Sequence, residues 1–266
     1  MNVTQMLVGD QDSQSGSGVG RNHLLGYLND WLCVGLFKDY SPNGLQVEGK
    51  AHIARVACAV TATLDVIGKA VEWGADALIV HHGWFWRGED SRIVGMRHRR
   101  IRALLQADIN LLAYHLPLDA HPEVGNNVMF GLALGWPKAE LLGAQGLVAR
   151  ACLPEAVGSE TVLQQLEGAL GRRPLAVGAL GRRIRTLAWC TGAAQDLLEE
   201  AVALGADAFV SGEISERTTH AARELGVVYF AAGHYASERY GIQALGRHLH
   251  RTFGLAWHFF EDPNPV

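Results

Sequence analysis

The sequence predicts an α/β fold built from two similar lobes that are related by an internal repeat. Three observations predict it: a strand–helix–strand segment that occurs twice, polar side chains that follow the predicted strands, and sufficient length. At 266 residues the chain is long enough to bury a full core in each of two lobes.

The repeat is clearest when LDVIGKAVEWGADALIV (64–80) is placed over QDLLEEAVALGADAFVS (195–211), which gives seven identities in seventeen positions. In each copy, apolar residues recur at helical spacing and are followed by Gly-Ala-Asp-Ala and a short apolar strand. Each copy also follows a strand-like run, ARVACAVTA in the first and RTLAWCTGA in the second. A strand–helix–strand unit normally joins parallel strands, so two parallel sheets are expected. The alternative is that Gly-Ala-Asp-Ala is only a common helix–strand junction.

Domain boundaries follow from the repeat and from composition. Residues 1–20 are rich in Ser, Gly, Gln and Asp and are expected to form a mobile tail. The first α/β lobe is placed at residues 21–127 and the second at 128–266, with the option that the C-terminal part packs back on the first lobe.

The repeat continues into a second helix and a third strand in each copy. Aligning INLLAYH with VVYFAAGH on their ends superposes His115 on His234 and, four residues later, Asp119 on Glu238. Both lobes thus carry a histidine and an acidic residue after the corresponding strand.

A pair of histidines, His81 and His82, ends the predicted strand ALIVHHG. The carboxyl edge of a parallel sheet is the usual place for ligand sites in α/β folds. Neighbouring residues of a regular strand point to opposite faces, so the two imidazoles are expected to serve two different ions after a turn at Gly83. The alternative for a lone histidine pair is a structural or surface role.

The two H-x3-acid segments differ in their expected local structure. At a helix start, His234 and Glu238 would lie on one face, because residues four apart are neighbours. In HLPLD, Pro117 favours an extended or turning segment, so His115 and Asp119 need not bind together.

These groups predict a site for two divalent metal ions, with His81, His82, Asp119, His234 and Glu238 as ligands. Neutral imidazoles and carboxylates suit Zn, Fe, Mn, Co or Ni and do not choose among them. Two ions about 3.5–4 Å apart can share a bridging water and lower its pKa toward neutrality. Glu238 is a candidate bridge between the ions.

Composition limits the classes of function. A net charge of −4 argues against a dedicated nucleic-acid binder, so a small-molecule substrate is expected. No apolar stretch reaches the length of a membrane helix and no signal peptide is recognisable, which predicts a cytoplasmic protein. The four cysteines are scattered singly and are expected to be buried structural thiols.

Five longer strings carry a family resemblance: SPNGLQVEGK, GADALIVHHGWFWRGE, HLPLDAHPEVGNN, SGEISERTTHAARE and AAGHYASERYGIQAL. They resemble the Nif-three-like family, whose bacterial members carry the name GTP cyclohydrolase 1 type 2 homologue. The match runs from about residue 22 to the end of the sequence.

The resemblance implies a dinuclear site between two similar α/β lobes and assembly into a ring-shaped homohexamer. It places the metal ligands on His81, His82, Asp119, His234 and Glu238, with Glu238 as the bridge, and makes His115 a residue that orients Asp119 or a bound water. Glu238 and His115 are therefore the candidate catalytic residues. The family name implies hydrolytic opening of the imidazole ring of GTP.

Three functions remain open at this stage. The first is a metal-dependent hydrolase that acts on a nucleotide or a cyclic amide. The second is a metal-binding, storage or scaffold protein without turnover. The third is nucleic-acid processing by the same two ions, which the acidic balance disfavours.

Several neighbouring residues have open roles. The aromatic run Trp84, Phe85 and Trp86 could stack a flat ring or pack a lobe or subunit interface. Asn43 and Gln46 could bind a ligand edge or form a plain turn, and Glu213 could line the cavity or be a satisfied structural carboxylate. The arginines of residues 97–102 fall on the solvated side of a helix whose buried stripe is expected to be Ile93, Ile101, Leu104 and Leu105.

Overall fold

The computed structural model describes residues 18–266. The mobile tail predicted for residues 1–20 therefore lies outside the described residues except at its end. There, β1 (Val19–Gly20) pairs with β3 (His52–Ile53) in a small antiparallel sheet.

Contacts divide the chain into two compact units. The first unit contains residues 1–118 and 242–262, and the second contains residues 119–241 and 263–266. The sequence placed the lobe boundary after residue 127. Each unit contains one large sheet, which confirms a mixed α/β fold with two sheets.

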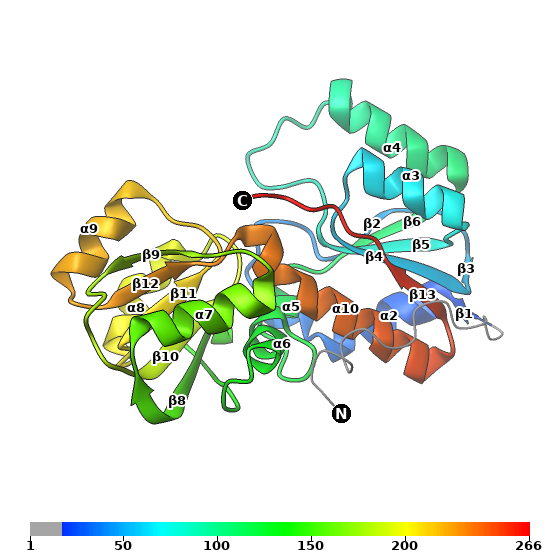
Figure 1. Cartoon of the computed structure of the whole chain (residues 1–266). Helices are drawn as coiled ribbons and strands as arrows, with labels where there is room; N and C mark the ends of the chain where they lie inside the picture. Colours follow the sequence, from blue (N-terminus) through cyan, green and yellow to red (C-terminus); the bar gives the residue numbers. More distant parts are fainter. Residues whose placement is uncertain (1–17) are drawn as a thin grey trace. The chain divides into compact units, whose positions relative to one another are not determined.

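The large sheet of the first unit has the strand order β13-β4-β5-β6-β2. Strands β13, β4, β5 and β6 are parallel, and β2 is antiparallel to β6. The strands are β2 (Gly44–Val47), β4 (Arg55–Thr61), β5 (Ala77–His82), β6 (Asn110–Ala113) and β13 (Ala256–Phe259). The helices are α2 (Arg21–Trp31), η1 (Val34–Leu36), α3 (Leu64–Trp73) and α4 (Gly95–Ala107). Figure 1 shows α3 and α4 together on one face of this sheet.

The sheet of the second unit has the strand order β7-β8-β10-β11-β12-β9. Strands β10, β11 and β12 are parallel, and the outer strands are antiparallel to their neighbours. The strands are β7 (Glu140–Leu142), β8 (Val148–Val157), β9 (Leu175–Gly178), β10 (Ile184–Cys190), β11 (Ala208–Ser211) and β12 (Val228–Ala231). The helices are α6 (Asn126–Ala133), η2 (Ala144–Gly146), α7 (Ser159–Leu170), η3 (Gln195–Leu197), α8 (Leu198–Ala203) and α9 (Glu216–Glu224).

Two helices cross the divisions between the units. Helix α5 (Leu116–Asp119) contains the division after residue 118, and α10 (His234–Phe253) contains the division after residue 241. Each of these helices carries predicted metal ligands in the part that belongs to the second unit.

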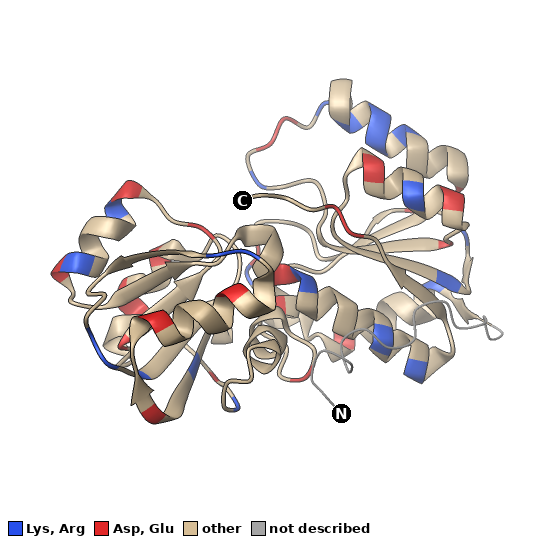
Figure 2. Cartoon of the chain, in the orientation of Figure 1, with Lys and Arg blue, Asp and Glu red and all other residues tan. Residues whose placement is uncertain are grey.

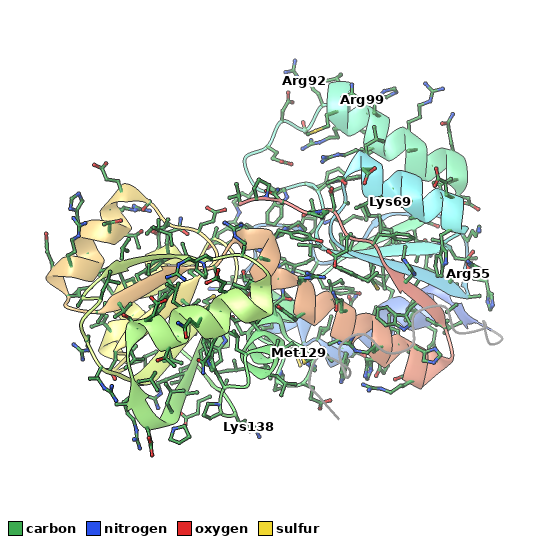
Figure 3. The ribbon with its side chains drawn as sticks, viewed as in Figure 1. Arg55, Lys69, Arg92, Arg99, Met129 and Lys138 are labelled. Atoms are coloured by element: carbon green, nitrogen blue, oxygen red, sulfur yellow. The ribbon has the colours of Figure 1, made fainter. Side chains whose placement is uncertain are left out.

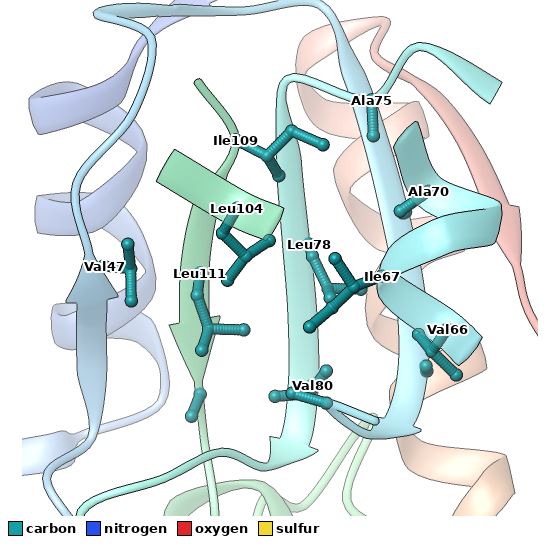
Figure 4. Close-up of a cluster of buried hydrophobic side chains, with 14 of the residues drawn as sticks. Val47, Val66, Ile67, Ala70, Ala75, Leu78, Val80, Leu104, Ile109 and Leu111 are labelled. Atoms are coloured by element: carbon teal, nitrogen blue, oxygen red, sulfur yellow. The ribbon is translucent and has the colours of Figure 1, made fainter. Parts of the chain in front are cut away.

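The core of the first unit lies between its sheet and the helices α3 and α4. Leu78 and Val80 of β5 and Leu111 of β6 meet Ile67 of α3 and Leu104 of α4, as the close-up in Figure 4 shows. The burial of these branched side chains leaves the ends of β5 and β6 fixed by packing, because interiors of this kind are close-packed.

The Gly-Ala-Asp-Ala repeat performs the same structural role in both units. Asp76 accepts hydrogen bonds from the backbone N–H groups of Ala54 and Arg55 (2.9 Å each) and from Lys50 Nζ (2.7 Å). Asp207 accepts from the N–H groups of Arg185 and Thr186 and from Arg182. The aspartate thus ties the helix–strand junction to the start of the preceding strand in each copy.

The helix ends follow local sequence signals. Thr63 caps α3 by accepting a hydrogen bond from Val66 N, and Gly74 ends the helix with a φ of 75°. In the second copy, Gly205 has a φ of 84° at the equivalent place. A glycine is required at both junctions because this left-handed conformation strains other residues.

The prediction for α4 was partly wrong. Ile101 and Leu104 are buried, whereas Leu105 is 58% exposed, and Ile93 is exposed because it precedes the helix. Figure 2 shows the basic residues gathered on α4, and Figure 3 shows Arg99 extending from it. Arg99 and Arg102 are exposed, as the spacing predicted.

The cysteine prediction also holds only in part. Cys58 and Cys190 are buried, but Cys33 and Cys152 are exposed. Among residues 18–266, no helix combines the length and apolar character needed to cross a membrane.

Candidate metal centre

His81 and His82 occupy the carboxyl end of β5. His81 is fully buried, and its Nδ1–H donates to the carbonyl oxygen of Tyr114 at 2.9 Å. This bond fixes the tautomer that leaves Nε2 as the electron-pair donor, which is the usual arrangement behind a metal-binding histidine. His82 is half-buried, with Nδ1 3.3 Å from Thr61 Oγ1.

The two imidazoles lie closer together than regular strand alternation predicts. Their ring centroids are 4.6 Å apart. The pairing of β5 with β6 ends at Val80, whereas β5 stays paired with β4 as far as His82. Gly83 cannot carry a side chain, because a Cβ at this position would collide with Gln46 and with Ala113.

His115 joins the same cluster from the segment that follows β6. One ring nitrogen from each of His81, His82 and His115 lies within 4.8 Å of the others. The ring centroids of His81 and His115 are 5.1 Å apart. The structure therefore brings the predicted catalytic histidine to the predicted metal histidines within the first unit.

Asp39 holds His115 in place, and sequence reasoning did not identify it. His115 Nδ1–H donates to Asp39 Oδ1 at 2.7 Å, and Leu116 N donates to Oδ2 at 3.0 Å. The carboxylate is only 4% exposed. Burial opposes its ionisation, but the hydrogen bonds and charge of His115, with further bonds from Asn43 and Tyr40, lower the pKa of Asp39 to about 2.

Asn43 and Gln46 make hydrogen bonds within the loops of the first unit. Asn43 donates to Asp39 and accepts from the backbone N–H of His115. Gln46 accepts from Trp84 N at 2.7 Å and donates to the carbonyl oxygens of Trp84 and Pro42. Their amide groups are thus used in fixing the loops around His115.

His234 and Glu238 form the corresponding group in the second unit. They lie four residues apart in the first turns of α10, with Nε2 and Oε2 3.0 Å apart, as the helical prediction required. Glu238 is 2% exposed. The carboxylate and the imidazole therefore point to a common position.

Glu213 supports His234 from the other side. Its Oε1 accepts from His234 Nδ1 at 2.7 Å, so it is the carboxylate that orients the ring. Burial lowers the pKa of His234, but Glu238 and Glu213 outweigh burial and raise the pKa to about 9. An imidazole flanked by two carboxylates is well suited to a cation in place of its second proton.

Asp119 is buried in α5 and is held by a residue that the sequence did not indicate. Asn126 Nδ2 donates to Asp119 Oδ1 at 2.9 Å, and Asn126 Oδ1 accepts from Gly241 N at 3.0 Å. Asn126 is fully buried. It lies in the string HPEVGNN, but nothing in that string distinguishes it from its neighbours.

HLPLD was predicted to be extended or turning, and the structure has the turning form. Residues 116–119 form a single helical turn, and Pro117 is its second residue. Proline is tolerated there because the first N–H groups of a helix have no partner within the helix.

Gly192 makes room for the second-unit group. It has a φ of 72°, and a Cβ at this position would overlap Glu238 Oε1 and approach His234 Nε2. Its N–H donates to Ser237 Oγ. The residue after Thr191 must therefore be small, a requirement that only the folded arrangement reveals.

The predicted superposition of His115 on His234 is off by one residue. Val80 pairs with Ala113 in the first sheet, and Ser211 pairs with Ala231 in the second. Counting from these pairs, His115 matches Gly233, and His234 matches Leu116, the first residue of α5. The sequence alignment matched the strand ends at their histidines, whereas the strand pairing in the structure places the two histidines one residue apart.

The buried donors fit a divalent metal ion. The first unit supplies oriented imidazoles, and the second supplies an imidazole and two buried carboxylates. These buried clusters can hold metal ions of the class that prefers nitrogen and oxygen ligands.

Comparisons with known proteins agree along nearly the whole chain. The sequence profile of the Duf34/NIF3 (NGG1p interacting factor 3) family matches residues 19–265. A protein of Allochromatium vinosum named GTP cyclohydrolase 1 type 2 homolog is 48% identical over 245 residues, which cover 91% of this chain and 96% of that protein. A Pseudomonas aeruginosa protein of the same name is 47% identical, and the match covers 89% of this chain and 94% of that protein. The solved structure of protein ybgI, described as of unknown function, is 43% identical with a TM-score of 0.89 and covers 93% of this chain and 100% of its own.

Proposed function

The chain belongs to the Duf34/NIF3 family, and from that premise we propose that it is a metal-dependent hydrolase. In this proposal His81, His82, Asp119, His234 and Glu238 together hold two divalent ions. The ions supply Lewis-acid activation of water near neutral pH when bound.

The observation that carries the proposal is the oriented state of the histidines. His81 is fixed through Nδ1 by a backbone carbonyl, and His234 is fixed through Nδ1 by Glu213. A satisfied core histidine needs no such pairing with further imidazoles or carboxylates at its second nitrogen. Both rings instead present Nε2 beside other donors, which supports ligand roles.

The chain's own residues divide the remaining work. Glu238 would help to hold the ions, and its almost fully buried carboxylate, 3.0 Å from His234 Nε2, could accept a proton from the attacking water. His115 is held by Asp39 through Nδ1 and so presents Nε2 near His81 and His82, where it can exchange a proton with the substrate.

The substrate class comes from the relatives, which carry the name GTP cyclohydrolase 1 type 2 homolog. We propose a nucleotide or a related cyclic amide or amidine, opened by hydrolysis. We also propose a homohexamer, as the family resemblance implies, which light scattering of the purified protein tests.

The decisive experiment measures formate release from GTP by protein reconstituted with Zn, Fe, Mn, Co or Ni. Replacing Glu238 by Gln keeps the volume but exchanges one carboxylate oxygen for an amide NH2 group, which neither binds a cation nor accepts a proton, so the rate should fall more than about a hundred-fold. Glu224→Gln, an exposed substitution on α9, is the matched control and should leave the rate unchanged.

Two results would contradict the hydrolase. One is an equal rate in wild-type and Glu238→Gln protein. The other is full metal occupancy without turnover on GTP or on a panel of cyclic amides, which would favour a metal-binding scaffold.

A further inference from the structure

Three consecutive aromatic residues, Trp84, Phe85 and Trp86, follow the histidines of β5, and the structure gives each a different environment. Trp84 is 5% exposed, and its indole Nε1–H donates to the carbonyl oxygen of Ala62. It belongs to the core beneath α3, so it is not available to a ligand.

Phe85 lies beside Arg97 of α4. Its φ of 66° is uncommon for a residue with a side chain and reverses the chain direction at this point. The ring is 37% exposed and has the guanidinium of Arg97 over it at 5.8 Å. Phe85 therefore faces the α4 side of the loop.

Trp86 returns toward the histidine cluster. Its ring centroid lies 4.9 Å from that of His115 in an edge-to-face arrangement (86°) and 6.0 Å from that of His82. An edge-to-face contact covers at most one face of the indole, and the residue is only half-buried. A flat molecule on the exposed part of Trp86 would thus lie beside the two imidazoles.

The loop that carries Trp86 is fixed in place. Arg87 N donates to the carbonyl oxygen of Tyr40 at 2.7 Å, and Gln46 binds both backbone groups of Trp84. A second aromatic ring, that of Tyr40, lies 6.5 Å from His115 and is 60% exposed. The aromatic surface beside His115 is therefore preorganised, which reduces the entropy lost on binding a ring.

We propose that Trp86 is a specificity-determining residue, which stacks a planar heteroaromatic ring of the substrate beside His82 and His115. The inference deepens the proposed function and rests on it for the identity of the site. Stacking on Trp86 would favour flat, conjugated rings such as purines over saturated cyclic amides, because only a flat ring can stack on an indole over its whole area.

Binding, rather than turnover, is the direct test. Full-length metal-loaded protein is titrated with guanosine, GTP and inorganic triphosphate by calorimetry, in wild type and in Trp86→Leu, Trp86→Phe and Phe85→Leu. Trp86→Leu should weaken guanosine and GTP about ten-fold, the loss expected for one stacked base. Trp86→Phe should recover most of that loss, and inorganic triphosphate should bind the Trp86→Leu protein as it binds wild type.

Phe85→Leu is the matched control, because it removes a neighbouring ring whose cation–π contact is with Arg97 rather than with His82 or His115. It should change each affinity less than about two-fold. Metal content and melting temperature, measured for every variant, separate lost stacking from lost structure.

Three results would overturn the assignment. They are unchanged guanosine affinity in Trp86→Leu, an equal loss in Phe85→Leu, and a wild-type protein that binds neither guanosine nor GTP. A wild-type protein that binds guanosine through Trp86 but releases no formate would contradict the hydrolase and leave the stacking role standing.

Discussion

The two repeat copies have the same strand order and the same aspartate hydrogen bonds, but they differ in the side chains at their strand ends. Asp76 and Asp207 make the same bonds to the start of the preceding strand, and in each copy a third parallel strand follows the second helix. At the end of the second strand, however, the first copy has His81-His82 and the second has Gly212-Glu213. Elements that hold the strands together are retained, while the side chains at the carboxyl edge have diverged.

The comparison extends to the carboxylates that orient the histidines. His115 is oriented by Asp39, which lies outside the repeat near the N-terminal helix, whereas His234 is oriented by Glu213, which lies inside it. The same physical requirement, a carboxylate on Nδ1, has been met from different parts of the chain. The repeat therefore indicates where each histidine lies, but it does not indicate which carboxylate orients that histidine.

The largest expected effects differ between these two carboxylates: one substitution should affect metal binding and the other turnover. Glu213→Gln should weaken metal binding about 10–100-fold, because it loosens a proposed ligand. Asp39→Asn should lower turnover about 10–100-fold but leave metal content close to wild type, because His115 is not among the five proposed ligands. Metal titration and formate release measure the two effects.

Conservative substitutions at exposed carboxyl groups, Asp30→Asn and Glu224→Gln, are the controls and should change neither quantity. If Asp39→Asn weakened metal binding as much as Glu213→Gln does, His115 would be a ligand and the proposed division of roles would be wrong.

A smaller effect, on stability, tests whether Asp76 and Asp207 have equivalent roles. Asp76→Ala and Asp207→Ala should each lower the free energy of unfolding by about 2 kcal/mol, since each removes hydrogen bonds to a charged acceptor. Chemical denaturation measures the loss. Clearly unequal losses would show that the two junctions are not equivalent.

The pH dependence of these variants has a defined sign. Burial raises the pKa of Asp76, but its hydrogen bonds outweigh burial and lower it, and the same balance holds for Asp207. A lowered pKa in the folded state contributes stability above the unfolded pKa of about 4, which is lost as the pH falls through the folded value. The difference between wild type and each variant should therefore be largest near pH 7 and shrink below about pH 4.

Sequence alone was enough for the features that depend on local pattern. The strands and helices of both copies, the placement of His81 and His82 at a strand end, and the pairing of His234 with Glu238 on one helical face all follow from periodicity. The family resemblance is confirmed by the match over residues 19–265.

The residues that were missed depend on contacts between distant segments. Asp39 contacts His115 across 76 positions, and Gly192 makes room for Glu238 across 46. Neither has a motif of its own, because a hydrogen-bonded carboxylate and a small residue are defined by what packs against them. For HLPLD the sequence left an extended and a turning form open, because the effect of Pro117 depends on its position in a helix.

The proposal that His81, His82, Asp119, His234 and Glu238 hold two metal ions per chain carries the hydrolase. Its most direct test is the number of ions per chain, measured by mass spectrometry of metal-replete protein, in wild type, His81→Ala and His234→Ala. The account predicts two ions in wild type and the loss of at least one ion in each variant. Two ions retained in either variant, or clearly fewer than two in the wild type, would contradict it.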